Sequence, residues 1–218
     1  MKKFTQIAID GPAAAGKSTI AKIVAAQLGY VYVDTGAMYR AITWATLNAG
    51  IDMAVEENVA YLLAETTIEL APGEKVLVND VDVTDVIREP AVTNSVSLVA
   101  AYGQIRDVLK ERQAMLAEST NVIMDGRDIG TNVLPNADFK FFMIADPRVR
   151  AERRYKENVE RGIPADIDVL EQEIRERDEK DANREHAPLK QASDAILLDT
   201  SNMSIEDVVA EIVRFVKS

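Results

Sequence analysis

The sequence predicts an α/β fold of three layers, with a five-stranded parallel sheet covered by helices. Two observations predict it. Short β-branched or apolar runs alternate along the chain with segments of helical periodicity, which is the order that parallel strands and crossover helices give. The runs VIMD at 122–125 and FKFFMI at 139–144 are almost wholly apolar, as expected for strands buried on both faces.

The predicted elements follow one another in a regular order. Strands are predicted over 5–10, 30–34, 122–125, 139–144 and 195–199. Helices are predicted up to Gly29, over 36–49, 95–119, 148–161 and 168–183, and from Ile205 to Val216. Pairs at i,i+4 spacing, such as Glu171 with Arg175, support an exposed helix at 168–183.

The segment 51–95 differs from the rest, and we predict a small α+β insert there within a single domain of residues 1–218. A helix is expected over 55–65. Short strands are expected over 66–70, 75–79 and 81–83, with turns at Pro72-Gly73 and Asn79-Asp80. A hairpin excursion without a function of its own is the alternative.

Composition narrows the class of protein. The chain has 218 residues, 47% hydrophobic and 28% charged, with a formal net charge of -11, so a folded chain that repels nucleic acid is expected. It has no cysteine, which excludes disulfides and cysteine-ligated zinc and fits a cytoplasmic location. No apolar stretch reaches the roughly 18 residues of a membrane-spanning helix. We expect a monomer without a membrane partner.

A glycine-bounded loop between the first predicted strand and helix satisfies G-x-x-x-x-G-K-[ST] at residues 11–18. Its backbone N–H groups and the helix N-terminus favour an anion, Lys17 supplies a point charge for phosphates, and Ser18 offers a hydroxyl to Mg²⁺. The predicted nucleotide-binding residues are Gly11, Pro12, Ala13, Ala14, Ala15, Gly16, Lys17, Ser18 and Thr19. The loop predicts a triphosphate site and leaves kinase, GTPase, ATPase and regulator open.

Arginines in an acidic chain favour a kinase with a phosphorylated acceptor. Guanidinium groups bind phosphate bidentately and stay ionised, and Arg127 directly follows a strand, at the edge where α/β sheets bind ligands. A solvated surface charge is the alternative for any one arginine. Asp125, at the same strand end, is expected either to approach Mg²⁺ through water or to form a helix cap or loop hydrogen bond.

Four motifs make the chain resemble the bacterial cytidylate kinases. They are IAIDGPAAAGKST at 7–19, DTGAMYRA at 34–41, DGRDIGT at 125–131 and ERDEKDANREHAPL at 176–189. The resemblance runs nearly end to end. It implies a kinase of pyrimidine metabolism that transfers the γ-phosphoryl group of ATP, with Mg²⁺, to CMP or dCMP. It also implies that 51–95 belongs to the monophosphate-binding region and that 148–166 forms a helical lid.

The resemblance further implies roles for single residues. Those near the acceptor phosphate would be Thr35, Arg40 and Arg127. Those reading the cytosine edge would be Ser97, Arg106, Asp128 and Arg184. Those holding the ribose and phosphate would be Arg177 and Asp181. The catalytic residues would be Lys17, Arg127 and two lid arginines that close over the transferring phosphate, Arg153 and Arg154.

The chemistry of the bases supports part of this assignment. Cytosine presents an amino donor beside two acceptors, so a carboxylate with an arginine can read it, whereas the O4 of uracil would be repelled by Asp128. The alanines at 13–15, where another glycine is expected, should matter little because backbone groups bind the phosphates. Two other functions stay open: a P-loop kinase acting on shikimate or a sugar acid, and a nucleotide-sensing module or regulatory NTPase.

Overall fold

The computed structural model describes residues 4–71 and 73–217, which form two compact units. Unit 1 is made by the chain up to Tyr32 and from Ala117 onward, and unit 2 by Val33–Leu116. Of the turn predicted at Pro72-Gly73, Pro72 lies outside the described residues. No helix in residues 4–71 and 73–217 has the length and apolar character that crossing a bilayer requires.

The central sheet has five strands in the spatial order β2-β6-β1-β7-β8. The strands are β1 (Gln6–Asp10), β2 (Val31–Asp34), β6 (Val122–Gly126), β7 (Phe139–Ile144) and β8 (Ile196–Asp199). The pairings of β1 with β6, β1 with β7, and β7 with β8 are parallel. The strands predicted from apolar runs are therefore confirmed.

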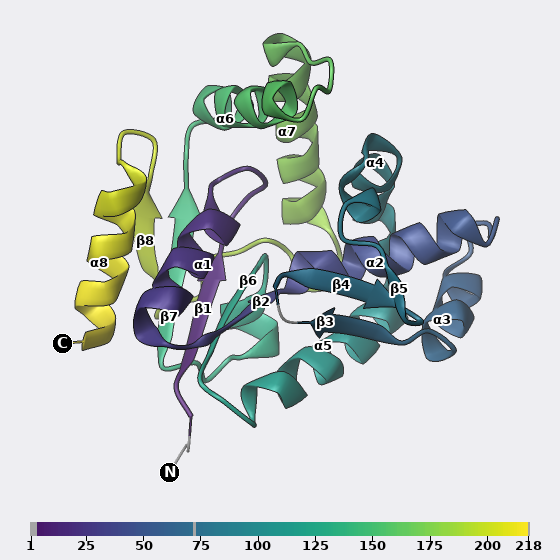
Figure 1. Cartoon of the computed structure of the whole chain (residues 1–218), viewed down its shortest axis with the longest axis horizontal. Coiled ribbons are helices and arrows are strands. Elements are labelled where there is room, and N and C mark those ends of the chain that lie inside the picture. The colour runs from purple at the N-terminus through teal and green to yellow at the C-terminus, as the bar shows by residue number, and fades with distance from the viewer. Residues whose placement is uncertain (1–3, 72, 218) are drawn as a thin grey trace. The chain divides into compact units, whose positions relative to one another are not determined.

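In the described part of unit 1, four α-helices surround the sheet or follow it. They are α1 (Lys17–Leu28), α6 (Pro147–Glu160), α7 (Ile167–Asn183) and α8 (Ile205–Lys217). Of these, α1 and α8 pack on the sheet. Helices α1 and α8 lie side by side, while α6 and α7 lie beyond the carboxyl-terminal ends of β1 and β7 (Figure 1). That end of the sheet is where the phosphate-binding loop follows β1.

The core of unit 1 explains why these elements form. Ile9 and Phe141 on the strands are buried against Val24 of α1 and Ile212 of α8, in one contiguous apolar cluster. The apolar stripe of the last helix, predicted from its spacing, is the face that packs here. The sheet and α1 therefore form a packed support for the loop between them.

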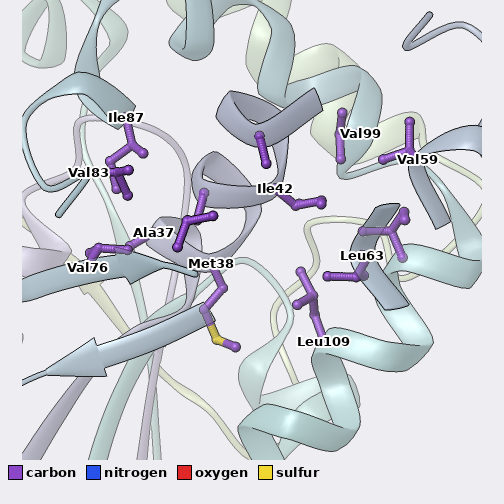
Figure 2. Close-up of a cluster of buried hydrophobic side chains, with 14 residues drawn as sticks. Ala37, Met38, Ile42, Val59, Leu63, Val76, Val83, Ile87, Val99 and Leu109 are labelled. Atoms are coloured by element: carbon purple, nitrogen blue, oxygen red, sulfur yellow. The ribbon is translucent and has the colours of Figure 1, made fainter. Parts of the chain in front are cut away.

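Unit 2 surrounds a separate apolar core. Its elements are α2 (Thr35–Asn48), α3 (Glu56–Ala64), β3 (Ile68–Ala71), β4 (Lys75–Val78), β5 (Val81–Asp82), a 3₁₀ turn η1 (Val86–Arg88), α4 (Pro90–Val99) and α5 (Gly103–Ala117). Strands β3, β4 and β5 form an antiparallel sheet. Figure 2 shows Met38 and Ile42 of α2 among Leu63, Val76 and Leu109 from three other elements.

The predicted α+β segment 51–95 lies within unit 2, where α3 and the three short strands match the predicted pattern. The region 95–119, predicted to be mostly helical, contains the end of α4 and the whole of α5 up to Ala117. Helix α4 begins earlier, at Pro90, because proline at a first helical position loses no hydrogen bond.

Candidate functional site

The phosphate-binding loop lies at the carboxyl end of β1, as the sequence predicts. A Cβ atom on Gly11 would lie 2.0 Å from the carbonyl oxygen of Met143, so only glycine fits there. Lys17 is buried at the start of α1, and its Nζ donates a hydrogen bond to the carbonyl oxygen of Pro12 over 2.7 Å. The loop therefore curls around an ammonium group at a helix N-terminus, an arrangement that favours anions.

Ala14 in this loop adopts a left-handed conformation, with φ 57°. For a residue with a Cβ, this conformation costs roughly 1–2 kcal/mol. The methyl group of Ala14 packs against a small cluster of Ala151, Leu170 and Ile174 from α6 and α7. The alanines thus matter more than the sequence suggests, because one is strained and joins the loop to α6 and α7.

Asp125 lies at the end of β6, beside the start of α1. Its two carboxylate oxygens accept hydrogen bonds from the Ser18 hydroxyl and the Tyr32 hydroxyl, each over 2.8 Å. Asp125 is buried, and these two bonds come from side chains in the first turn of α1 and on β2. A hydroxyl and a carboxylate, both hard oxygen ligands, are thus held together next to the loop.

The charge around Lys17 is unusual for a buried lysine. Burial lowers the pKa of Lys17 to about 7, and repulsion by Arg127 and Arg177 adds to this, while Asp125 and Asp10 oppose it. Two guanidinium groups are therefore close enough to the loop lysine to disfavour its charge. An anion in the loop would relieve this repulsion.

Five of the predicted acceptor residues come together in unit 1. We name them the Asp181 cluster: Arg127, Asp128, Arg177, Asp181 and Arg184. Arg127 Nε lies 2.9 Å from Asp181 Oδ2, and Arg184 Nη2 lies 3.4 Å from Asp128 Oδ1. Burial raises the pKa of Asp181, but Arg127, Arg177 and Arg184 together outweigh burial and lower it. Guanidinium groups from the segments that follow β6 and α7 therefore pair with buried carboxylates.

Asp10 fixes the turn that carries Arg127 and Asp128, and the sequence analysis did not assign it a role. It is the last residue of β1, and its carboxylate accepts hydrogen bonds from the N–H groups of Ile129 and Gly130 over 2.8 and 2.7 Å. These begin a π-helical turn after β6. Burial raises the pKa of Asp10 to about 6 despite these two bonds. The position of Asp10, a carboxylate directly before the loop of residues 11–16, is the sequence signal that could have suggested a role for it.

The two arginines predicted for the lid are on α6. Arg153 donates to the carbonyl oxygen of Thr200 over 2.6 Å and to that of Ala15 over 3.4 Å. Arg154 lies half-buried on the same helix. Arg153 thus touches the phosphate-binding loop directly.

In unit 2, a second group of arginines gathers at the end of β2. We name it the Asp34 cluster: Asp34, Arg40 and Arg88. Asp34 caps α2 by accepting from the Ala37 N–H over 2.8 Å, and it pairs with Arg40 over 2.8 Å and Arg88 over 3.5 Å. Burial raises the pKa of Asp34, but both arginines outweigh burial and lower it. Sequence reasoning missed Arg88, because no motif contains it.

Arg40 keeps one donor unused, since its buried Nε has no hydrogen-bond partner among residues 4–71 and 73–217. The other predicted residues of unit 2 lie on three of its helices. Thr35 is the buried first residue of α2, and Ser97 lies half-buried on α4. Arg106 is buried on α5, donates to the Ala100 carbonyl oxygen over 3.0 Å and lies 5.5 Å from the ring centre of Tyr39.

Comparison with known proteins decides the family. A family model described as cytidylate kinase matches residues 7–218. The chain belongs to the cytidylate kinase family. The cytidylate kinase of Geobacillus kaustophilus (strain HTA426) is 53% identical over 219 residues, covering 99% of this chain and 98% of that protein. That of Listeria monocytogenes serovar 1/2a is 54% identical over 214 residues, covering 97% of this chain and 96% of that protein.

The fold of this cytidylate kinase family member is also similar to that of solved structures. A shikimate kinase from Bacteroides thetaiotaomicron aligns with a TM-score of 0.50 at 15% identity, over 98% of this chain and 99% of that one. A gluconokinase from Sinorhizobium meliloti 1021 aligns with a TM-score of 0.50 at 15% identity, over 100% of this chain and 96% of that one. At such identity the likeness concerns the fold alone, and it confirms the predicted α/β class.

Proposed function

We propose that this chain transfers the γ-phosphoryl group of ATP to CMP or dCMP, giving ADP and CDP or dCDP, in pyrimidine nucleotide metabolism. Family membership over residues 7–218 supports the reaction class. The single observation that carries the proposal is the gathering of guanidinium groups near the loop: Asp181 holds Arg127 over 2.9 Å, and Arg127 and Arg177 add to the effect of burial in lowering the pKa of Lys17. Phosphoryl transfer needs such positioned charge more than it needs a proton relay.

The donor phosphates would lie in the loop of residues 11–16. Backbone N–H groups there and at the start of α1 can cradle the phosphate oxygens. Lys17 Nζ, which now donates to the Pro12 carbonyl oxygen, would turn to the β and γ phosphates. Arg153 and Arg154 would neutralise the transferring group from α6, and Arg153 is already hydrogen-bonded to the loop at the Ala15 carbonyl oxygen.

The acceptor phosphate would be bound by arginines that the protein holds in place beforehand. Arg127 is held by Asp181, and the unused buried Nε of Arg40 offers a donor to an anion. Thr35 would add a hydroxyl, and Arg177 with Asp181 would hold the ribose and phosphate. Prior ordering of guanidinium groups lowers the entropy lost when phosphate binds.

The cytosine edge would be read by a carboxylate with arginines. Asp128 is buried and pairs with Arg184 over 3.4 Å, so its carboxyl group is held in place, and it would accept a hydrogen bond from the amino group of cytosine. Ser97 and the buried Arg106 would add a hydroxyl and a guanidinium group. A uracil O4 would face the same carboxylate and be repelled.

The residues present fit a magnesium ion. Mg²⁺ is usually held by one or two protein oxygens, several waters and the substrate phosphates rather than by a cage of carboxylates. Within residues 4–71 and 73–217, no three His, Cys, Asp or Glu side chains gather as a metal cage. The Ser18 hydroxyl and the Asp125 carboxylate, joined over 2.8 Å, match this sparse set. Ser18 would hold the ion directly and Asp125 through water, and the ion would neutralise phosphate charge.

The remaining expectations concern the state of the protein. We propose that it works as a monomer in the cytoplasm, with no nucleic acid among its partners, since its net charge of -11 repels a phosphate backbone. Residues 148–166, which include most of α6, would act as the lid over the donor, and 51–95 would act as part of the monophosphate-binding region.

A coupled assay of ADP release tests the function. The full chain would be given ATP, Mg²⁺ and, in turn, each ribo- and deoxynucleoside monophosphate, shikimate and gluconate. We expect fast ADP release with CMP and dCMP and background release with shikimate and gluconate. Release that is slow and independent of every acceptor would favour a regulatory NTPase instead, and release with shikimate would overturn the assigned acceptor.

A further inference from the structure

Arg150 of α6 is a buried arginine to which the proposed reaction gives no role. Its side chain is 3% exposed. Its guanidinium group donates in three directions: Nε to the carbonyl oxygen of Ala145 over 2.9 Å, Nη1 to that of Ala13 over 3.0 Å, and Nη2 to Asp178 Oδ2. One side chain thus joins the β7–α6 junction, the phosphate-binding loop and α7.

The partner of Arg150 is less buried, since 25% of the Asp178 side chain is exposed. Asp178 lies on α7, and its second carboxylate oxygen, Oδ1, is buried without a hydrogen-bond partner among the described residues. A buried ion pair of this kind is a weak device for stability, since desolvation offsets much of the attraction. It does fix geometry, because a guanidinium group offers its donors in a rigid planar fork.

Arg150 contacts the middle of the loop, residues 13–15, whose backbone N–H groups are proposed to bind the donor phosphates. Three consecutive alanines contact α6 or α7: the Ala13 carbonyl oxygen through Arg150, the Ala14 methyl group through Leu170 and Ile174, and the Ala15 carbonyl oxygen through Arg153. Because a trans peptide is planar, its carbonyl and N–H groups point in opposite directions. A carbonyl of Ala13 that faces Arg150 therefore turns the N–H of Ala14 the other way.

We propose that Arg150, held by Asp178, is a positioning residue for the donor nucleotide: it orients the Ala13–Ala14 peptide so that the N–H group faces the donor phosphates. This rests on the proposed function for the identity of the ligand. It assigns Asp178 to the donor side, although its neighbours Arg177 and Asp181 on α7 are proposed to bind the acceptor.

Binding of the non-hydrolysable ATP analogue AMP-PNP to the full chain, measured by calorimetry with Mg²⁺, tests the proposal. We expect Arg150→Lys to weaken binding about tenfold, since lysine keeps the charge but cannot reach three acceptors in a planar fork. Asp178→Asn should weaken it about threefold, because an amide holds the guanidinium group less strongly than a carboxylate. The double variant should bind no more weakly than Arg150→Lys alone, since both act through one contact.

The matched control is Glu179→Gln, which removes an exposed carboxylate next to Asp178 on the same helix. It should leave binding within about twofold of the original, as expected for a solvated charge. In steady-state kinetics, Asp178→Asn should raise KM for ATP and leave KM for CMP unchanged within about twofold.

Two results would overturn the proposal. One is a lowered melting temperature in Arg150→Lys and Asp178→Asn with AMP-PNP affinity unchanged, since a merely structural ion pair would behave so. The other is a defect of Asp178→Asn confined to KM for CMP. A chain that fails to phosphorylate CMP would contradict the proposed function alone, because AMP-PNP binding is measured without an acceptor.

Discussion

The Asp181 cluster of unit 1 and the Asp34 cluster of unit 2 both hold arginines on a carboxylate, but they are assembled over different distances along the chain. Asp34 and Arg40 are six residues apart, and Asp34 also caps the helix that carries Arg40. Arg127 and Asp181 are 54 residues apart, the first directly after β6 and the second on α7. Arg88, the third member of the first cluster, is also 54 residues from Asp34. The Asp34–Arg40 pair is therefore fixed by local helix geometry, whereas Arg88 and the Arg127–Asp181 pair depend on packing between distant segments.

The two clusters nevertheless respond alike to pH. In both, arginines outweigh burial and lower the pKa of the carboxyl group. Stability from these groups is therefore present above the unfolded-state pKa of about 3.9 and is lost as the pH falls through their lower folded-state values. Two clusters that are assembled differently along the chain thus have the same electrostatic effect on their carboxyl groups.

The largest expected effect comes from breaking the Asp181 cluster at its arginine. Arg127→Gln should lower kcat/KM for CMP about 10³-fold, as expected when a charged donor to the transferring group is lost. The glutamine amide can still donate to Asp181, so the fold should persist. Steady-state ADP release checks the rate, and circular dichroism checks the fold.

The matched variant in the other cluster is Arg40→Gln. We expect kcat/KM for CMP to fall about 10–100-fold, since Arg40 is proposed to hold the acceptor phosphate rather than the transferring group. Equal losses in the two variants would mean that the two clusters contribute alike to the transition state, contrary to the roles proposed here.

Local patterns predicted most of the fold, and the residues they missed are held by long-range contacts. The strands and the loop at 11–18 follow from runs and spacings within a few residues. Nothing local reveals that Asp10 reaches the N–H groups of Ile129 and Gly130, about 120 positions away. Arg150 lies in the helix predicted over 148–161, but its contacts could not be predicted, because its partners Ala13 and Asp178 come from a distant loop and another helix.

The candidate site was predicted in the same uneven way. The motifs predict site roles for Arg127, Asp128 and Asp181, and the structure brings these residues together in unit 1. The contact of Arg88 with Asp34 was missed because Arg88 belongs to a short 3₁₀ turn, which has no recognisable hydrophobic periodicity. The left-handed conformation of Ala14 was missed because alanine rarely adopts it.

Asp10 sharpens the comparison, because this buried carboxylate is held by backbone N–H groups and its pKa is raised from 3.8 to about 6. The fold therefore binds more protons than the unfolded chain between these values. Its stabilising contribution is present below pH 3.8 and lost as the pH rises through about 6, opposite in sign to Asp34 and Asp181. The shift corresponds to about 3 kcal/mol.

The measurement compares the original chain with Asp10→Asn, which cannot titrate. The free energy of unfolding of the original chain, minus that of the variant, should fall by about 2 kcal/mol between pH 4 and pH 7, since part of the full shift lies below pH 4. Urea denaturation followed by circular dichroism gives both values. Lys17 and Asp128, whose charges also act on Asp10, are the same in both proteins. A difference independent of pH would contradict the raised pKa.

The next effect tests the local assembly of the Asp34 cluster. Asp34 uses Oδ1 to cap α2 and Oδ2 to bind the arginines. Asp34→Asn keeps a capping oxygen but loses the ion pairs, and it should destabilise the fold by about 2 kcal/mol. Asp34→Ala loses the cap as well and should cost about 1 kcal/mol more. Equal destabilisation by both variants in urea denaturation would show that the cap contributes nothing.

The smallest expected effect concerns Arg88, the outer member of the Asp34 cluster. Its side chain is 34% exposed and lies 3.5 Å from Asp34, whereas Arg40 lies at 2.8 Å. A partly solvated pair of this length contributes about 0.5 kcal/mol, so Arg88→Gln should lower the free energy of unfolding by no more than that. The rate with CMP should stay within about twofold, because Arg40 still holds the Asp34 carboxylate. A loss of rate as large as that of Arg40→Gln would place Arg88 in the acceptor site beside Arg40 and would make the Asp34 cluster a two-arginine site.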